Sequence, residues 1–415
     1  MLRPIALLLF LSLAFCKTAQ KTDTTSTPST QPTTTEMPKP PVSPPGDYAS
    51  EWAAIDSLER AGLFKSALEQ TEALYTRAKT DRNNPQMIKT LLFRGKYTTF
   101  LEEDGFVKAV QTFENEEKTA ADPAKAVLQS LLGQLYATYL QNQGWRVQER
   151  TPIPDGEGGD ILTWSAEQIE RRALDLYRLS VERTAVLIQT PVESFRTVLS
   201  PAQNDSVAGK SIRPTLFDLL AHRALEHFGN ERSYLTEPAF KFYLDQPEAF
   251  SPARDFVNIR FQSRDSASGK WLAIQLFQQV LRAHSSASGV QNEAALIAAD
   301  LLRLQFVQNN SILEDKNDRY QRALEYIHKD HYNHPSDAEI VYHLAQSLVA
   351  EDARTPDSDG RFLKRAVTEC EDAIRRHPGT FGAALCAALL ADIRHPALEI
   401  LAEQVVLPGK PALLS

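Results

Sequence analysis

Three histidines near the C-terminal third of the chain are the first candidates for chemistry. His328, His331 and His334 follow one another at steps of three. Imidazoles are common zinc ligands, and this spacing across a helix end can bring them toward one point. No cysteine or firmly placed carboxylate completes the set. The pattern therefore favours a solvated helix C-terminus, where a histidine complements the helix dipole, over a metal site.

A second pair of histidines lies within residues 213–228, RPTLFDLLAHRALEHF. His222 and His227 are five positions apart, so on a helix they point in different directions. The His-Glu-x-x-His motif of zinc proteases does not occur. We expect His222 to bond Asp218, one turn before it.

Two loops suggest ion or nucleotide binding. Asp155, Glu157 and Asp160 lie among glycines, but their spacing differs from a calcium-binding loop and no bidentate glutamate follows. Residues 205–211 end in Gly-Lys-Ser but lack the first glycine of a phosphate-binding loop and a preceding strand. Neither Gly-x-Ser-x-Gly nor the dinucleotide-binding glycine pattern is found. The sequence predicts no catalytic residue, no metal site and no cofactor, so we expect a protein that is not an enzyme.

The sequence around these residues predicts helices throughout the body of the chain. Alanine, leucine and glutamate dominate the body of the chain, glycine is sparse, and breaks recur about every 15 to 22 residues. We predict an all-α fold of stacked helical hairpins, a tetratricopeptide-like α-solenoid, from residue 48 to 405. The interpretation includes one long helix over 166–189, a short helix at 237–243 and small alanines packed inward over 381–393.

Residues 213–228 should form the central helix of this fold. Thr215 is a suitable N-cap, and Asp218 completes a capping-box-like pair with it. Leu216, Leu220 and Phe228 fall on one face, and Phe217 widens that face. A helix this apolar needs neighbours on more than one side.

The N-terminus reads as an export signal, residues 1–15, with Arg3 before an apolar run too short to span a bilayer. Leu13, Ala14 and Cys16 resemble a bacterial lipobox, although Phe15 is larger than usual there; an ordinary secretory leader is the alternative. Lipidation at Cys16 would give a membrane anchor. Residues 16–47 form a Thr/Pro-rich linker with too little apolar surface to fold, and we predict a disordered tether. In lipoproteins of this type Lys17 favours the outer membrane, either its periplasmic face or its surface.

Charge and cysteine count narrow the partners. The net charge is −8 with no dense basic block, which argues against nucleic acid. Besides Cys16 there are two cysteines, Cys370 and Cys386. They could pair in an exported protein. We favour the other interpretation, in which they are small buried residues on neighbouring helices.

Three stretches carry a family resemblance: residues 213–228, residues 52–59 (WAAIDSLE) with 62–69 (GLFKSALE), and residues 122–136 (DPAKAVLQSLLGQLY) with 160–164 (DILTW). They resemble the N-terminal helical region of large bacterial alpha-2-macroglobulin-like proteins, over most of residues 50–230. The resemblance implies a non-catalytic platform for a cell-envelope protease inhibitor, which would meet proteases through domains outside this chain. The family's thioester motif, Cys-x-Glu-Gln, begins at neither Cys370 nor Cys386.

The composition of the last residues, 406–415, differs from that of the helical segments and predicts an extended tail. Pro408, Gly409 and Pro411 fall within it. The resemblance explains it as the start of a β-sandwich domain, with the chain continuing beyond Ser415. The alternative reading is a stand-alone tetratricopeptide-like lipoprotein that binds peptides or glycans at the outer membrane. That reading needs a groove with exposed aromatic residues, which residues 240–256 could supply.

Overall fold

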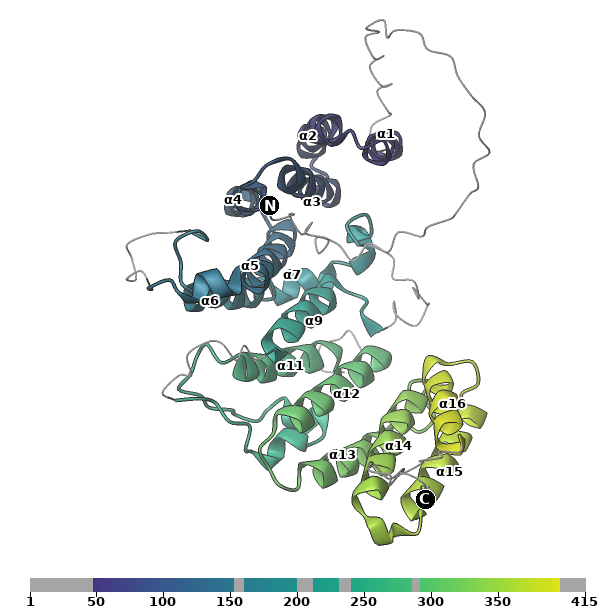
Figure 1. Ribbon diagram of the computed structural model, residues 1–415. Coiled ribbons are helices and arrows are strands. Elements are labelled where there is room, and N and C mark those ends of the chain that lie inside the picture. The colour runs from purple at the N-terminus through teal and green to yellow at the C-terminus, as the bar shows by residue number, and fades with distance from the viewer. Residues whose placement is uncertain (1–47, 153–159, 200–211, 231–239, 286–291, 396–415) are drawn as a thin grey trace, which may run out of the picture. The chain divides into compact units, whose positions relative to one another are not determined.

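The structure is a computed structural model that describes residues 48–152, 160–199, 212–230, 240–285 and 292–395. Helices make up nearly all of its regular structure (Figure 1), and extended pairing in these ranges is limited to two isolated bridges. The predicted all-α class with helical-hairpin packing is therefore confirmed. The export signal, Cys16 with its linker, and the tail 406–415 lie outside the described residues.

The described chain forms two compact units. The first contains the residues up to Phe242 together with Phe261–Ala295. The second contains Tyr243–Arg260 and the residues from Leu296 onward. The expected helical domain, 48–405, thus consists of two parts, which we describe separately.

In the first unit, each of the first six helices packs against the next, and short turns join the first five of them. Gly105 makes one of these turns possible, because a Cβ atom there would lie 2.1 Å from the carbonyl oxygen of Thr98. The helices in order are α1 (Ala49–Arg60), α2 (Phe64–Thr80), α3 (Asn84–Leu101), α4 (Gly105–Thr119), α5 (Ala124–Gln148) and α6 (Ala166–Leu179).

The predicted central helix is α9 (Leu216–Gly229), and it packs against α5, α6, α7 (Thr184–Gln189) and α11 (Gly269–His284). Thr215 is its N-cap in a complete capping box with Asp218, as predicted. Leu216, Phe217 and Ala224 are each 0 % exposed. Burial on more than one side, which the apolar stripe required, is confirmed.

Two predicted helices differ from the structure. The helix expected over 166–189 is interrupted: α6 ends at Leu179, and α7 (Thr184–Gln189) begins anew, followed by the short helix η1 (Val192–Phe195). Ser180 donates its hydroxyl hydrogen to the Tyr177 carbonyl and Thr184 to the Val181 carbonyl, contacts that compete with continued helix.

The short helix expected at 237–243 is also wrong where it can be compared, because residues 241–243 are not helical. Two short helices lie further along instead, η2 (Pro247–Phe250) and α10 (Ala253–Phe256). Pro247 is the first residue of η2 and Pro252 comes directly before α10. The preset φ angle of proline suits both positions.

The second unit continues with α12 (Glu293–Asn310, from Leu296), α13 (Lys316–Asp330), α14 (Asp337–Arg354), η4 (Pro356–Ser358), α15 (Arg361–Arg376) and α16 (Phe381–Arg394). Helix α14 lies at its centre and contacts α13, α15 and α16 (Figure 1). Gly382 lets α16 approach α14 closely, since a Cβ there would lie 2.3 Å from the Glu339 nitrogen. Cys370 and Cys386 are buried free thiols on α15 and α16, which confirms that interpretation.

The small residues of α16 are buried differently from the prediction. Ala384, Ala387 and Ala388 are exposed, whereas Gly382 and Cys386 are buried with Ala383. The face that meets α14 is therefore a narrow stripe with the period of a helix. The alanine-rich composition of this segment alone did not identify the face.

Candidate functional site

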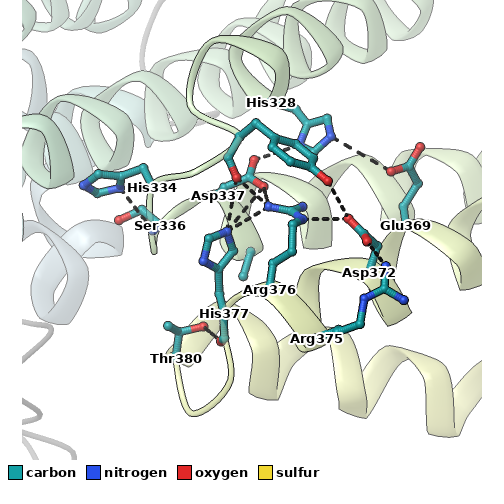
Figure 2. Close-up of polar contacts among 12 residues, drawn as sticks. His328, His334, Ser336, Asp337, Glu369, Asp372, Arg375, Arg376, His377 and Thr380 are labelled. Carbon is teal, nitrogen blue, oxygen red and sulfur yellow. Dashed lines mark hydrogen bonds and ion pairs between the residues drawn. The ribbon is translucent and has the colours of Figure 1, made fainter.

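Asp337, the first residue of α14, gathers the polar groups around the predicted histidine cluster (Figure 2). Its side chain is 0 % exposed. One oxygen, Oδ1, lies 2.7 Å from Nδ1 of His328, in the last turn of α13. The other, Oδ2, accepts a hydrogen bond of 2.7 Å from Nη1 of Arg376, at the end of α15. One carboxylate therefore connects the ends of two helices to the start of a third.

Arg376 extends this arrangement. Its Nε donates to Asp372 at 2.6 Å, and its guanidinium lies 3.8 Å from the ring centre of Tyr332, in the turn between α13 and α14. The Tyr332 hydroxyl donates to Asp372 at 3.2 Å. A planar guanidinium can satisfy several acceptors and stack on a ring at once. We call His328, Tyr332, Asp337, Asp372 and Arg376 the Asp337 cluster.

The three histidines of the predicted cluster do not converge. His328 contacts Asp337, whereas Nδ1 of His334 accepts a bond from the Ser336 backbone N–H at 3.1 Å, and Nε2 of His331 lies 4.0 Å from the Asp330 carboxylate. Among the residues that the structure describes, no group of three or more His, Cys, Asp or Glu side chains could hold a metal ion. The helix-end position was right, but a solvated end was wrong: the His328 side chain is only 16 % exposed and contacts a buried carboxylate.

A second buried pair lies in the first unit. The Asp218 carboxylate accepts from the Thr215 N–H at 3.0 Å and from the Thr215 hydroxyl at 2.7 Å, and it lies 2.6 Å from Nε2 of His284 on α11. Burial raises the pKa of the Asp218 carboxyl, but the contacts with His284 and Thr215 outweigh it and hold the pKa below its usual value. In the described ranges no hydroxyl or thiol lies within hydrogen-bonding distance of His284, so the pair lacks the nucleophile of a triad.

His222 contacts Asp218 as predicted, but through the backbone: Nδ1 lies 2.7 Å from the Asp218 carbonyl oxygen. Burial, with a contribution from the positive charge of Arg213, lowers the pKa of His222 to about 4. His227 turns to another partner, since its Nε2 lies 3.1 Å from the Glu170 carboxylate of α6. The two histidines thus point to different contacts, as expected from their spacing.

Of the residues considered for calcium, Asp155 and Glu157 lie outside the described residues. Asp160 uses its carboxylate to accept a bond of 2.9 Å from the Leu162 N–H, which stabilises the turn before α6. Trp164, which follows this loop, stacks on Tyr136 with ring centres 6.0 Å apart. Residues 205–211 are not described either.

A groove in the second unit is a candidate ligand site. It consists of two hollows, of about 300 Å³ and about 120 Å³, which share Pro252, Tyr326 and Ile327. One wall is the segment 247–254 and the other is a single face of α13. The α13 positions that line it recur at helical spacing: Arg319, Arg322, Ala323, Tyr326, Ile327 and Asp330.

Arg303 of α12 holds the irregular wall in place. Its side chain is 0 % exposed, its Nε donates to Asp300 at 2.9 Å, and its Nη1 donates to the Ala249 carbonyl at 2.6 Å. The guanidinium also lies 4.6 Å from the ring centre of Phe256. A buried charge needs this degree of pairing. Sequence reasoning missed Arg303, because its acceptor on Ala249 is 54 residues away in the chain.

Comparison with protein-family models finds no match, and neither the comparison with curated proteins nor the one with solved structures finds one. None of the helices in the described ranges has the length and apolar character needed to cross a membrane. The arguments about function therefore rest on the residues and contacts of the chain itself.

Proposed function

We propose that this chain is the non-catalytic helical platform of an alpha-2-macroglobulin-like, cell-envelope protease inhibitor. The observation that carries the proposal is that the buried aspartates are paired with side chains of neighbouring residues. Asp218, Asp300 and Asp337 each bind a cationic or imidazole side chain within their own unit. These contacts serve helix packing and leave the carboxylates without a reacting partner, which suits a support.

The sequence resemblance supports the same proposal. Its three stretches fall on α1 and α2, on α5 with the turn before α6, and on α9. In this proposal, lipid on Cys16 and the linker tether the platform to the outer membrane. Domains outside this chain then engage the protease, and no nucleic acid is bound.

The test uses the full gene product in its native cell. We expect wild-type protein to incorporate labelled palmitate and sediment with outer membranes, and the Cys16→Ser variant to do neither. An added protease should form a high-mass complex that contains the platform and keeps activity toward small substrates only. A protein that takes up no lipid, or that leaves proteases free, would contradict the proposal.

A second candidate function is favoured by the groove: a tetratricopeptide-like lipoprotein that binds peptides or glycans. Its supporting observation is the wall formed by residues 247–254, within the aromatic stretch expected to supply a groove. A peptide array and a glycan array probed with the purified protein would test it. Retention on neither array would refute it.

A further inference from the structure

We propose that the groove of the second unit binds the carboxyl terminus of an extended peptide whose last side chain is apolar. This inference rests on the second candidate function and specifies its ligand. It depends on three properties of the groove: its apolar floor, the arginines at one end, and its continuation past Tyr326.

The larger hollow can take an apolar side chain. Its volume of about 300 Å³ is at the lower end of ligand pockets. Its uncharged lining is almost entirely apolar or aromatic, with Ser251 as the polar exception. The lining residues of this kind are Pro247, Phe250, Pro252, Leu304, Ala323, Tyr326 and Ile327. Burial of a leucine-sized side chain against such a surface favours binding, because it removes apolar area from water.

The charged residues around the larger hollow favour an anion. Three arginines line it, Arg303, Arg319 and Arg322, and no acidic residue does. Arg303 is neutralised by Asp300, and Nε of Arg319 donates to Asp315 at 2.8 Å.

Arg322 is the cation that remains for a ligand. It donates from Nε to the Asp318 backbone carbonyl at 3.2 Å, and no carboxylate pairs with it among the described residues. Glu248, outside the lining, acts on Arg319, and Asp315, which is already paired with Arg319, interacts with Arg322 only at longer range. Arginine offers only donors, and a carboxylate is the acceptor that matches its fork.

The second hollow argues for a peptide rather than a small acid. It continues from the first across Pro252, Tyr326 and Ile327, so an occupant anchored at Arg322 can extend along α13. Its lining carries one arginine, Arg254, together with Asp300, Asp330 and His331, so this hollow is less cationic than the first. The lining of both hollows contains no asparagine or glutamine. Their planar amides, which donate and accept, would suit the hydroxyl groups of a glycan.

The experiment measures binding by fluorescence polarisation with the full chain. The probe is a labelled glycine–serine octapeptide that ends in leucine with a free carboxylate. The comparison probes are the same peptide as its carboxyl-terminal amide and the same peptide ending in serine. We expect the free acid ending in leucine to bind at least tenfold more tightly than either. Free N-acetylleucine should compete only weakly, because it does not reach the second hollow.

Variants assign the binding to the groove. Arg322→Gln should abolish the difference between acid and amide, and Ala323→Phe should fill the hollow and prevent binding of all probes. Lys329→Gln is the matched control: it makes the same charge change on an exposed position of α13 outside both hollows, and binding should be unchanged. Unchanged circular dichroism spectra would show that the variants fold.

Each other outcome overturns part of the proposal. Equal binding of acid and amide that Ala323→Phe still prevents would refute carboxylate recognition but leave a peptide groove. Competition by N-acetylleucine as strong as by the peptide would refute the extended ligand. No binding by any probe would refute the inference, while retention on the glycan array would still support the second candidate function.

Discussion

Replacing Asp337 by asparagine is the sharpest test of the Asp337 cluster. Asparagine keeps the size of the side chain but removes the charge, and its amide places donors next to the Arg376 guanidinium. Asp337 is 0 % exposed and Arg376 is 15 % exposed, so little water can replace the lost carboxylate. Breaking a buried ion pair by removing one partner costs about 3–5 kcal/mol. The amide oxygen can still accept from His328, so we expect a loss in the lower part of this range, about 3–4 kcal/mol of destabilisation of the second unit.

The assay must report on the second unit. All four tryptophans precede residue 296 and belong to the first unit, so tryptophan fluorescence would miss the effect. Urea unfolding followed by far-ultraviolet circular dichroism, together with hydrogen exchange at the start of α14, reports on it directly. In urea we expect a lower midpoint for the unfolding of the second unit, and in hydrogen exchange we expect the amides in the first turn of α14 to lose protection.

Asp330→Asn is the matched control, because the Asp330 side chain is 60 % exposed and lies 4.0 Å from His331. Such an exposed contact contributes about 0–1 kcal/mol. The double variant Asp337→Asn with Arg376→Met should recover part of the loss, since it also removes the guanidinium that has lost its buried acceptor. If Asp337→Asn destabilised the unit no more than Asp330→Asn does, the reasoning about this cluster would be refuted.

Three further predictions concern packing, capping and pH. Gly382→Ala should destabilise the protein by about 1–3 kcal/mol in thermal melts, because the new Cβ would lie 2.3 Å from the Glu339 nitrogen; an unchanged melting temperature would contradict the close contact. Thr215→Ala should cost about 1–2 kcal/mol, with Thr215→Ser nearly neutral in the same melts, because the hydroxyl caps α9 and binds Asp218. Burial lowers the pKa of His222 from 6.5 in the unfolded chain to about 4 in the folded protein. The unfolded chain therefore binds a proton more readily between these pH values, so the free energy of unfolding is highest above pH 6.5 and decreases as the pH falls toward 4. The decrease would be about 3 kcal/mol for a fully buried ring, and partial exposure of the ring reduces it. The stability measured by urea unfolding should therefore depend less on pH in His222→Gln, which has no imidazole at this position, than in the wild type.

The existence of the helices could be predicted from the sequence because the signals are local. The capping pair of Thr215 and Asp218 lies within a few residues of the start of the helix that it begins. Apolar spacing at a helical period identified the buried face of α9 in the same way. The break after Leu179 was missed because no proline or glycine marks it; hydroxyl contacts to the backbone end the helix instead.

The candidate sites could not be predicted, because their partners are distant in the sequence. Arg376 is 39 residues from Asp337, and His284 is 66 residues from Asp218. Without a structure, each acid has many equally plausible partners. The groove was expected only in outline. Residues 247–254 of the aromatic stretch form one wall, but its exposed aromatic residues, Phe240 and Tyr243, do not line the groove, and the face of α13 opposite depends on how the second unit folds.

The shared carboxylate of Asp337 has a consequence for how the second unit can change over time. Because side chains from α13 and α15 both depend on it, a substitution at Asp337, His328 or Arg376 is harmful unless the others change with it. These positions should therefore vary together among descendants of this chain. Exposed residues of the same helices, such as Lys329, are free to vary one at a time.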